Sequence, residues 1–313
     1  MAVLGTNTLQ TALLLHKHGD ATMREQLLRP LVDQGHGVSF AVTEPGVASS
    51  DPTQLRTTAR REGDEWVIDG RKWFTSWVDR SSHVIVMCRT EPDDVPVHRA
   101  FSMLVVPTDA PGFRIVRDLP VLGLHDIGSG HFEIALDEVR VPASALLGPQ
   151  GAGFTLSQDR LGPGRIYHCM RWLGQAQRAF ELMCARLHER EAFGGPLAGK
   201  QLMQQHVFES YAQIQACRLL TLHAAAAVDA GGDARVEIGA IKVVGARMLH
   251  DVIDRAVQAH GAAGLTDDTP LSHMYRAARF ARIYDGPDEV HIHTVARRLL
   301  KAARDGHPWD FAG

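Results

Sequence analysis

The feature that most constrains the fold is a change of hydrophobic pattern near residue 150 of this 313-residue chain. Before it, apolar runs of five or six residues are separated by Gly, Pro and Asp clusters, a pattern typical of β-strands. After it, apolar residues recur every three or four positions, a pattern typical of amphipathic helices. The expected strands are 84–88, 101–106 and 132–136, and the expected helices are 166–187, 207–228, 238–257 and 290–303.

The sequence therefore predicts an α+β protein. Its predicted regions are a partial N-terminal helical segment (1–36), a middle antiparallel β-barrel or sandwich domain (37–148) and a C-terminal four-helix bundle (149–313). Leucines at helical spacing predict a helix over 9–32. The run 66–74 is interpreted as a β-hairpin that turns at Asp69-Gly70.

Composition excludes several function classes. The formal net charge is −3 and no block of Lys or Arg stands out, so the sequence does not predict nucleic-acid binding. No apolar run reaches membrane-spanning length, and residues 1–15 lack the pattern of a signal peptide. The four scattered cysteines favour a reduced, cytoplasmic setting. His291 and His293 point to different faces of an expected helix, so no metal site is predicted.

One carboxylate stands out in the turn Arg282–Glu289, between two helical stretches. Gly286 and Pro287 break the helix just after Asp285, so this side chain can project from the end of an element into a cavity. A carboxylate held in such a low-dielectric pocket is a candidate proton-abstracting base. A helix-capping or solvated turn aspartate is the alternative interpretation.

A second motif, Phe40–Asp51, runs from an apolar strand into a Thr-Glu-Pro-Gly turn and small hydroxylated residues. Such a turn presents backbone N–H groups and hydroxyls suited to a flavin edge or a pyrophosphate. Together with Tyr284-Asp285-Gly286 it resembles the acyl-CoA dehydrogenase family over nearly the whole chain. The segment Asp-Gly-Pro-Asp-Glu-Val-His, residues 285–291, resembles the branch that is fused to a kinase-like domain in animals. Relative to that family, the chain lacks most of the helical domain that precedes Leu9.

The resemblance implies FAD-dependent α,β-dehydrogenation of an acyl-CoA, a step of fatty acid metabolism and β-oxidation. Asp285 would take the α-proton, the β-hydrogen would pass as hydride to flavin N5, and electrons would leave to an electron-transfer flavoprotein. The flavin ribityl chain and the backbone N–H of Asp285 would bind the thioester carbonyl. The family majority has Glu at this position, so Asp285 is shorter by roughly 1.5 Å of reach. Some relatives place the base one residue before the arginine matching Arg165, and that position here is Gly164.

The resemblance also implies the contacts of cofactor and substrate. Cofactor contacts are Phe40, Val42, Thr43, Ser49, Ser50, Phe74, Thr75, Ser76, Arg190, Phe193, Gln201, Gln258, Gly261 and Glu289; substrate contacts are Ser50, Arg165 and Gly286. Arg190 and the Gln201 and Gln258 side chains would reach the cofactor across a subunit interface, which implies a homodimer or homotetramer.

Two alternatives remain. A nitroalkane-oxidase-like enzyme of the same fold would use Asp285 to deprotonate a more acidic carbon and would consume oxygen. A truncated, non-catalytic helical interaction module would bind no FAD.

Overall fold

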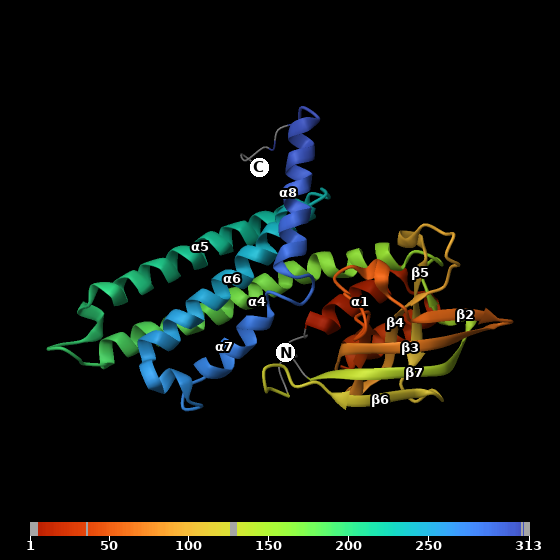
Figure 1. Ribbon diagram of the computed structural model, residues 1–313, viewed down its shortest axis with the longest axis horizontal. Helices are drawn as coiled ribbons and strands as arrows, with labels where there is room; N and C mark the ends of the chain where they lie inside the picture. Colours follow the sequence, from red (N-terminus) through yellow and green to blue (C-terminus); the bar gives the residue numbers. More distant parts are fainter. Residues whose placement is uncertain (1–5, 36, 126–129, 308, 310–313) are drawn as a thin grey trace. The chain divides into compact units, whose positions relative to one another are not determined.

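The computed structural model describes residues 6–35, 37–125, 130–307 and 309. These residues fall into two compact units, Met1–Gly164 and Arg165–Gly313 (Figure 1). The unit boundary lies inside helix α4 (Gly153–Glu189), which therefore contributes residues to both units.

The N-terminal helical segment of the first unit is broken once. Its elements are α1 (Thr6–His18), α2 (Ala21–Met23), the π-helical turn η1 (Arg24–Leu28) and α3 (Arg29–Asp33). The single helix expected over 9–32 is thus wrong in detail. The chain turns at Gly19-Asp20, because the Asp20 carboxylate caps the next helix by accepting a hydrogen bond from the Met23 N–H at 2.7 Å. Leu14, Leu15, Leu27 and Leu31 are buried against the sheet.

Eight strands of the described residues form one sheet. They are β1 (Gly37–Ala41), β2 (Thr58–Glu62), β3 (Glu65–Ser76), β4 (Ser81–Arg89), β5 (Phe101–Pro107), β6 (Phe113–Asp118), β7 (His131–Pro142) and β8 (Leu146–Leu147). The order is β6-β7-β3-β2-β4-β5-β8, with β1 added beside β4. Most pairs are antiparallel, but β1 and β2 each pair with β4 in parallel.

Alternate side chains of the central strands enter two separate cores. Ile85 and Met87 of β4 pack on the side of the N-terminal helices, whereas Val84 and Val86 pack on the opposite side. Burial on both faces explains why this strand is a continuous apolar run rather than an alternating one. The α+β class predicted from the sequence is confirmed.

The hairpin expected at Asp69-Gly70 is wrong. Strand β3 runs straight through these residues and pairs with β7 on both sides, with a register shift between Ile68 and Gly70. A side chain at Gly70 would place its Cβ 2.4 Å from Thr57 Oγ1, so the glycine permits a close approach rather than a turn. The hairpin actually lies at Gly63-Asp64, between β2 and β3.

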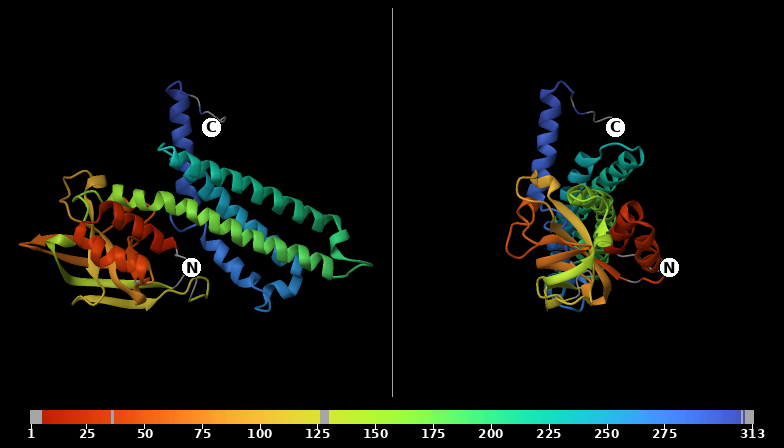
Figure 2. Two further views of the ribbon diagram at one scale, coloured as in Figure 1. Left: turned by 180° about the vertical axis from the view of Figure 1, so that it is seen from behind. Right: turned by 90° about the vertical axis from the view of Figure 1, so that its right-hand side faces the viewer.

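The second unit is helical. Besides the C-terminal part of α4 it contains α5 (Gln201–Asp229), α6 (Arg235–His260), the 3₁₀ turn η7 (Gly261–Leu265), α7 (Leu271–Phe280) and α8 (Asp288–Arg304). The four helices expected from the apolar periodicity lie within α4, α5, α6 and α8, whereas α7 was not predicted. Helices α5 and α6 lie side by side in all views (Figure 2). One core joins α4, α5, α6 and α7 around Trp172, Leu249 and Leu271.

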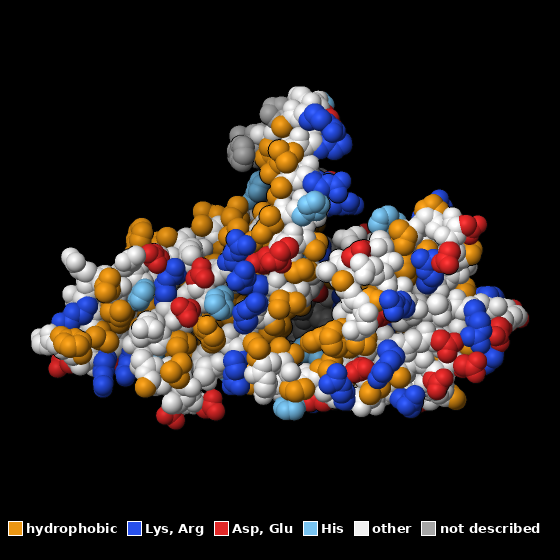
Figure 3. Space-filling model, in the orientation of Figure 1, with side chains coloured by type: hydrophobic (Ala, Val, Ile, Leu, Met, Phe, Trp, Pro, Cys, Tyr) orange, Lys and Arg blue, Asp and Glu red, His pale blue; other side chains and the backbone are white. Residues whose placement is uncertain are grey.

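Apolar side chains remain exposed on two helices of the second unit. They are Leu202, Phe208, Tyr211, Leu219 and Leu222 on α5, and Val290, Ile292 and Leu300 on α8 (Figure 3). Four of them expose 66–71% of their surface, namely Leu202, Phe208, Leu219 and Leu300. Within the described part of the chain, no helix is both long and apolar enough to cross a bilayer.

Candidate functional site

The candidate base lies in a short turn between α7 and α8, residues 281–287, which we call the acid turn. Asp285 has a left-handed backbone with φ +54°, and its side chain keeps 20% of its surface exposed. A non-glycine residue in this region stores roughly 1–3 kcal/mol of strain and persists only where its surroundings fix it. Aspartate tolerates this backbone better than most residues, which gives a local reason for Asp here.

Three side chains fix the backbone of the acid turn. Arg165 Nε donates to the Asp285 carbonyl at 3.0 Å, and His291 Nε2 lies 3.1 Å from the same oxygen. Lys242 Nζ, fully buried on α6, donates to the carbonyls of Ala281 at 2.8 Å and Gly286 at 3.1 Å. The turn is therefore held at its first residue, Ala281, and near its end, at Asp285 and Gly286.

Gly286 is required by both conformation and space. Its φ is +101°, and a Cβ added there would lie 2.6 Å from His291 Nε2. The absence of a side chain at Gly286 lets the imidazole of His291 approach the turn. Gly286, which was predicted as a substrate contact, directly follows Asp285 in the chain.

A buried carboxylate anchors the start of α8. Asp288 is 1% exposed, and its Oδ2 accepts hydrogen bonds from Arg282 Nε at 2.9 Å and Arg247 Nε at 3.2 Å. The Asp288 N–H donates to the carbonyl of Arg282 at 3.1 Å, which closes the loop that contains Asp285. This short chain segment cannot change its shape without breaking a buried, charge-assisted contact.

The Asp285 carboxylate has a partner that the sequence did not indicate. His168 Nε2, on α4, lies 3.1 Å from Asp285 Oδ2. The His168 ring stacks on Trp172 at 5.8 Å between ring centroids, and meets Tyr284 edge-on at 4.8 Å. Tyr284 is itself held, because its hydroxyl accepts a hydrogen bond from Trp172 Nε1 at 2.8 Å.

Burial sets the charge states around the acid turn. It lowers the pKa of Lys242 to about 8, against the opposing pull of the Asp285 carboxylate. Burial, with help from Arg165, lowers the pKa of His291 to about 4. Burial also lowers the pKa of His168, although Asp285 acts in the opposite direction. Both imidazoles are thus neutral near pH 7, and His291 donates its Nε2–H to the carbonyl oxygen of Asp285.

The first unit holds the second sequence motif equally firmly. Lys72 Nζ of β3 is fully buried and donates to the carbonyl of Val42 at 2.9 Å and to Glu44 Oε1 at 2.8 Å. The Glu44 carboxylate also accepts the N–H groups of Arg56 at 2.7 Å and Thr57 at 2.9 Å. Although burial alone raises the pKa of Glu44, the Lys72 ammonium and these donors hold it below its usual value.

The predicted cofactor segment of β3 contains an irregularity. Register with β7 shifts between Lys72 and Thr75, and Phe74 has φ +52° with 44% of its surface exposed. The bulge turns the Phe74 ring outward, where it packs edge-on against Trp73. The Thr75 hydroxyl is buried and meets no hydrogen-bonding partner among the described residues, whereas Ser76 Oγ lies 2.9 Å from His131 Nδ1.

Other predicted residues of the first unit have protein partners of their own. The Phe40 ring lies under the Arg160 guanidinium at 3.9 Å. The carbonyl of Thr43 accepts the Trp73 N–H at 2.9 Å, and Ser49 Oγ accepts the Glu44 N–H at 2.9 Å. Ser50 is exposed.

Five predicted cofactor residues of the second unit line one groove of about 850 Å³. They are Arg190, Phe193, Gln201, Gln258 and Gly261. The groove lies where α4 and α6 end and α5 begins, with Arg186 and Lys200 among its lining residues. Phe193 is 95% exposed with φ +51°, so its ring projects away from its own unit. Glu289 lies apart from this groove, exposed in the first turn of α8.

Comparison with known proteins identifies the family. The acyl-CoA dehydrogenase middle-domain model matches residues 39–137, and the acyl-CoA dehydrogenase C-terminal-domain model matches residues 151–300. The chain is 50% identical to the probable acyl-CoA dehydrogenase FadE2 of Mycobacterium tuberculosis, over 92% of this chain and 71% of that protein. The chain belongs to the acyl-CoA dehydrogenase family.

Two further acyl-CoA dehydrogenase relatives define the branch and the fold. Acyl-CoA dehydrogenase family member 11 of Rattus norvegicus is 41% identical over 92% of this chain, which spans 38% of that protein. A putative acyl-CoA dehydrogenase structure from Mycobacterium abscessus matches with a TM-score of 0.91 and 40% identity, covering 95% of this chain and 74% of that one. The predicted family and branch are confirmed. Members of the acyl-CoA dehydrogenase family are FAD-dependent oxidoreductases, so the predicted enzyme class is confirmed at that level.

The position that carries the base in some acyl-CoA dehydrogenases is closed here. A Cβ added at Gly164 would lie 1.6 Å from Gln10 Nε2, within the first unit. No side chain fits there without displacing Gln10. Asp285 therefore remains the candidate base of this acyl-CoA dehydrogenase.

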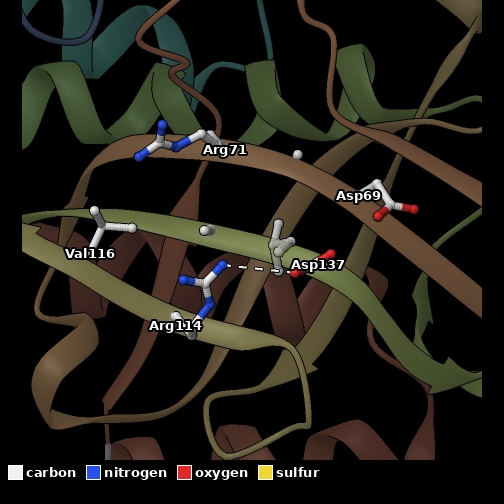
Figure 4. Close-up of a pocket in the computed structure, with 8 residues that line it drawn as sticks. Asp69, Arg71, Arg114, Val116 and Asp137 are labelled. Carbon is white, nitrogen blue, oxygen red and sulfur yellow. Dashed lines mark ion pairs between the residues drawn. The ribbon is translucent and has the colours of Figure 1, made fainter.

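A second groove, of about 500 Å³, lies on the sheet of the first unit (Figure 4). Asp69, Arg71, Arg114 and Asp137 line it, and an ion pair of 3.8 Å joins Arg114 to Asp137. Arg71 pairs with Glu133 at 2.8 Å. Opposite charges thus neutralise one another across the groove, and it contains none of the residues expected to bind FAD or acyl-CoA.

Sequence reasoning missed four members of the site: His168, Lys242, Asp288 and His291. Weak signals existed for two of them. Lys242 is a charge inside the apolar stripe of α6, and His168 follows Arg165 by three residues, so both lie on one helix face. His291 was considered only as a metal ligand, together with His293.

Proposed function

We propose that this chain binds FAD and catalyses α,β-dehydrogenation of an acyl-CoA thioester, with Asp285 as the base that removes the α-proton. The observation that carries the proposal is the acid turn. Asp285 is held in a left-handed backbone by Arg165, His291 and the buried Lys242. Such a costly arrangement for one partly exposed carboxylate is typical of a catalytic acid or base.

The residues present fit FAD. The unpartnered, buried Thr75 hydroxyl and the outward Phe74 ring supply a hydrogen-bonding group and an aromatic face in the first unit. The groove of the second unit gathers Arg190, Gln201 and Gln258, which suit a phosphate and a polar ring edge. When bound, FAD supplies the acceptor for the hydride that leaves the β-carbon.

The chain's own residues perform the proton transfer. The Asp285 carboxylate takes the α-proton of the thioester, while Arg165 and His291 prevent the backbone of Asp285 from rotating away. Fixing the base in advance matters, because a displacement of about 1 Å can cost on the order of 100-fold in rate. The α-carbon is a weak acid, so donors to the thioester oxygen, the Asp285 N–H among them, stabilise the enolate charge as it develops.

The partners follow from the same proposal. Electrons leave the reduced enzyme to an electron-transfer flavoprotein, in a cytoplasmic setting that the four free thiols allow. The exposed apolar side chains of α5 and α8 form contacts with further copies of the chain in a homodimer or homotetramer. In that assembly the groove around Arg190 and Phe193 holds the adenine side of a cofactor bound to the neighbouring subunit.

Anaerobic flavin bleaching tests the proposal. Purified protein loaded with FAD is yellow, and a series of acyl-CoA esters is added while the absorbance is recorded. The expected result is bleaching by at least one ester, and no bleaching of Asp285→Asn, which retains its colour. Full bleaching of the Asp285→Asn variant overturns the assignment of the base. Colourless protein that takes up no FAD supports the non-catalytic helical module instead.

One observation favours a second enzyme of this fold. Asp285 stands where most of the family has Glu, so the second candidate substrate is not a simple acyl-CoA but a nitroalkane, whose carbon is more acidic. Oxygen consumption with nitroethane, in the absence of any CoA ester, would support this reading. The acyl-CoA proposal expects no such consumption.

A further inference from the structure

His168 is placed by contacts on several sides. The residue is buried on α4, with Nε2 at 3.1 Å from Asp285 Oδ2 and Nδ1 at 3.1 Å from an Arg171 terminal nitrogen. Trp172 stacks on its ring and Tyr284 meets the ring edge-on, with the Tyr284 hydroxyl 3.5 Å from Nδ1. The ring can neither flip nor tilt without losing one of these contacts.

These contacts determine which nitrogen carries the proton. A guanidinium only donates hydrogen bonds, so Nδ1 of His168 must accept from Arg171. A neutral imidazole that accepts at Nδ1 carries its hydrogen on Nε2. The Nε2–H therefore donates to the carboxylate of Asp285. The charged and titratable groups facing the ring are Asp285 and Tyr284 from the acid turn, Arg171 from α4 and Lys242 from α6.

We propose that His168 is the positioning residue of the Asp285 base: its Nε2–H holds Oδ2 and fixes the carboxylate in one rotamer. This inference rests on the proposed function of Asp285. Few orientations of a short aspartate side chain reach the α-carbon. The orientation of the Asp285 carboxylate must therefore be set by a contact to the side chain itself. The hydrogen bonds of Arg165, His291 and Lys242 described above reach backbone carbonyls of the turn, whereas the hydrogen bond from His168 reaches the carboxylate.

The proposal also accounts for aspartate in place of the family's Glu. With aspartate at position 285, Oδ2 already lies at hydrogen-bonding distance, 3.1 Å, from His168 Nε2, so this contact suits the shorter acid. The matched pair is therefore a short acid together with a histidine on α4, one fixed by the other. Arg171 takes part indirectly, because it sets the tautomer of His168.

The kinetic test compares two replacements of His168 in the FAD-loaded full chain. His168→Leu removes the donor, and we expect flavin reduction to fall on the order of 100-fold with little change in KM. The acid limb of the rate profile should also move to higher pH, because a carboxylate without this donor binds protons more tightly. His168→Gln keeps an N–H near the Nε2 position and should restore about tenfold of the loss.

His250→Gln is the matched control. His250 is a half-buried histidine of the same unit; its ring packs on Tyr275 at 5.1 Å between ring centroids, and its Nδ1 lies 3.9 Å from Asp251 Oδ1. This variant should keep both the rate and the pH profile of the unmodified protein. Equal losses in the His168 and His250 variants would indicate a general packing effect and overturn the proposal.

Nitrogen NMR tests the hydrogen bond between His168 Nε2 and Asp285 Oδ2 without any turnover of substrate. In protein labelled with ¹⁵N-histidine, the His168 signals are assigned by their loss in His168→Gln. We expect a neutral ring at pH 7 with its hydrogen on Nε2, and a changed Nε2 shift in Asp285→Asn. A hydrogen on Nδ1 would overturn the proposal, and so would an Nε2 chemical shift that is the same in Asp285→Asn and in the unmodified protein.

Different results would disprove the role of Asp285 and the role of His168. If Asp285→Asn bleaches as fast as the unmodified protein, the proposed function of Asp285 is wrong whatever His168 does. If Asp285→Asn is inactive while His168→Leu keeps the full rate and an unchanged pH profile, the base is right and the positioning role of His168 is wrong.

Discussion

Two fully buried lysines, one in each unit, hold the two segments that the sequence marked as functional. Lys72 donates to the carbonyl of Val42 and pairs with the Glu44 carboxylate at 2.8 Å. Lys242 instead donates to two carbonyls of the acid turn, Ala281 and Gly286. The first lysine is thus neutralised by an adjacent carboxylate, whereas the second binds backbone dipoles and feels Asp285 and Asp288 through space.

This difference indicates that Lys72 has a structural role, whereas Lys242 belongs to a site whose protonation can change. Burial lowers the pKa of Lys72 as well, but the Glu44 carboxylate in direct contact with its ammonium opposes that shift. Lys242, with its pKa lowered to about 8, is close to losing its proton, and it lies in the field of the candidate base. We therefore expect Lys72 to govern stability and Lys242 to govern the chemistry of Asp285.

Lys72→Met should give the largest effect on stability. It leaves the buried Glu44 carboxylate without its cation, and breaking a buried pair costs about 3–5 kcal/mol. Urea unfolding followed by tryptophan fluorescence measures this loss, since Trp66, Trp73 and Trp77 all lie in the first unit.

The double variant Lys72→Met/Glu44→Gln is the control for that measurement. It removes the orphaned charge and should recover part of the stability lost in Lys72→Met. A Lys72→Met protein as stable as the unmodified chain would show that Lys72 does not have the structural role described.

Lys242→Met should act mainly on rate. The acid turn loses its two hydrogen bonds from Nζ, so Asp285 moves, and flavin reduction should fall on the order of 100-fold. Stability should fall by only about 1–2 kcal/mol, because the unpaired carbonyls are partly offset by removal of a desolvated charge. A variant that unfolds like Lys72→Met but keeps its rate would reverse our assignment of the two lysines.

The pH dependence of stability should give the smallest effect. Unfolded histidine binds a proton below about pH 6.5, whereas His291 in the fold binds one only below about pH 4. The unfolded chain therefore binds more protons between these values, and stability rises with pH through this window. The free energy of unfolding should be lower at pH 4.5 than at pH 7.5 by about 2.5 kcal/mol.

His291→Gln should flatten that dependence, since the amide can still donate to the carbonyl of Asp285 without titrating. Unfolding curves at several pH values between 4.5 and 7.5 provide the measurement. If the slope stays the same in the variant, groups other than His291 cause it.

The contrast between the units also explains how much could be predicted from the sequence. The Phe40–Asp51 motif and the acid turn are each a single stretch of chain, so Thr43 and Asp285 could be recognised from the sequence. His168 and Lys242 belong to different helices and meet the turn only after folding, so no spacing in the sequence brings them to it. Helix α7 was missed because it is only ten residues long and its buried residues are just Leu271 and Ala278.

Local turn signals were the least reliable guide. Asp69-Gly70 is typical of a hairpin, yet strand β3 continues through it because Gly70 lies against Thr57. The true hairpin uses Gly63-Asp64, six residues earlier. A glycine that permits close packing cannot be told from one that permits a turn unless the neighbouring strand is known.

The central claim is that the Asp285 carboxylate removes a proton from the α-carbon of an acyl thioester. Solvent-deuterium exchange tests it directly with 3,3-dimethylbutyryl-CoA, which has α-protons but no β-hydrogen and so cannot be oxidised further. The FAD-loaded chain in D₂O should place deuterium at the α-carbon, measured by mass spectrometry, and Asp285→Asn should not exceed the rate without protein. Equal deuterium incorporation by Asp285→Asn and the unmodified chain would contradict the account.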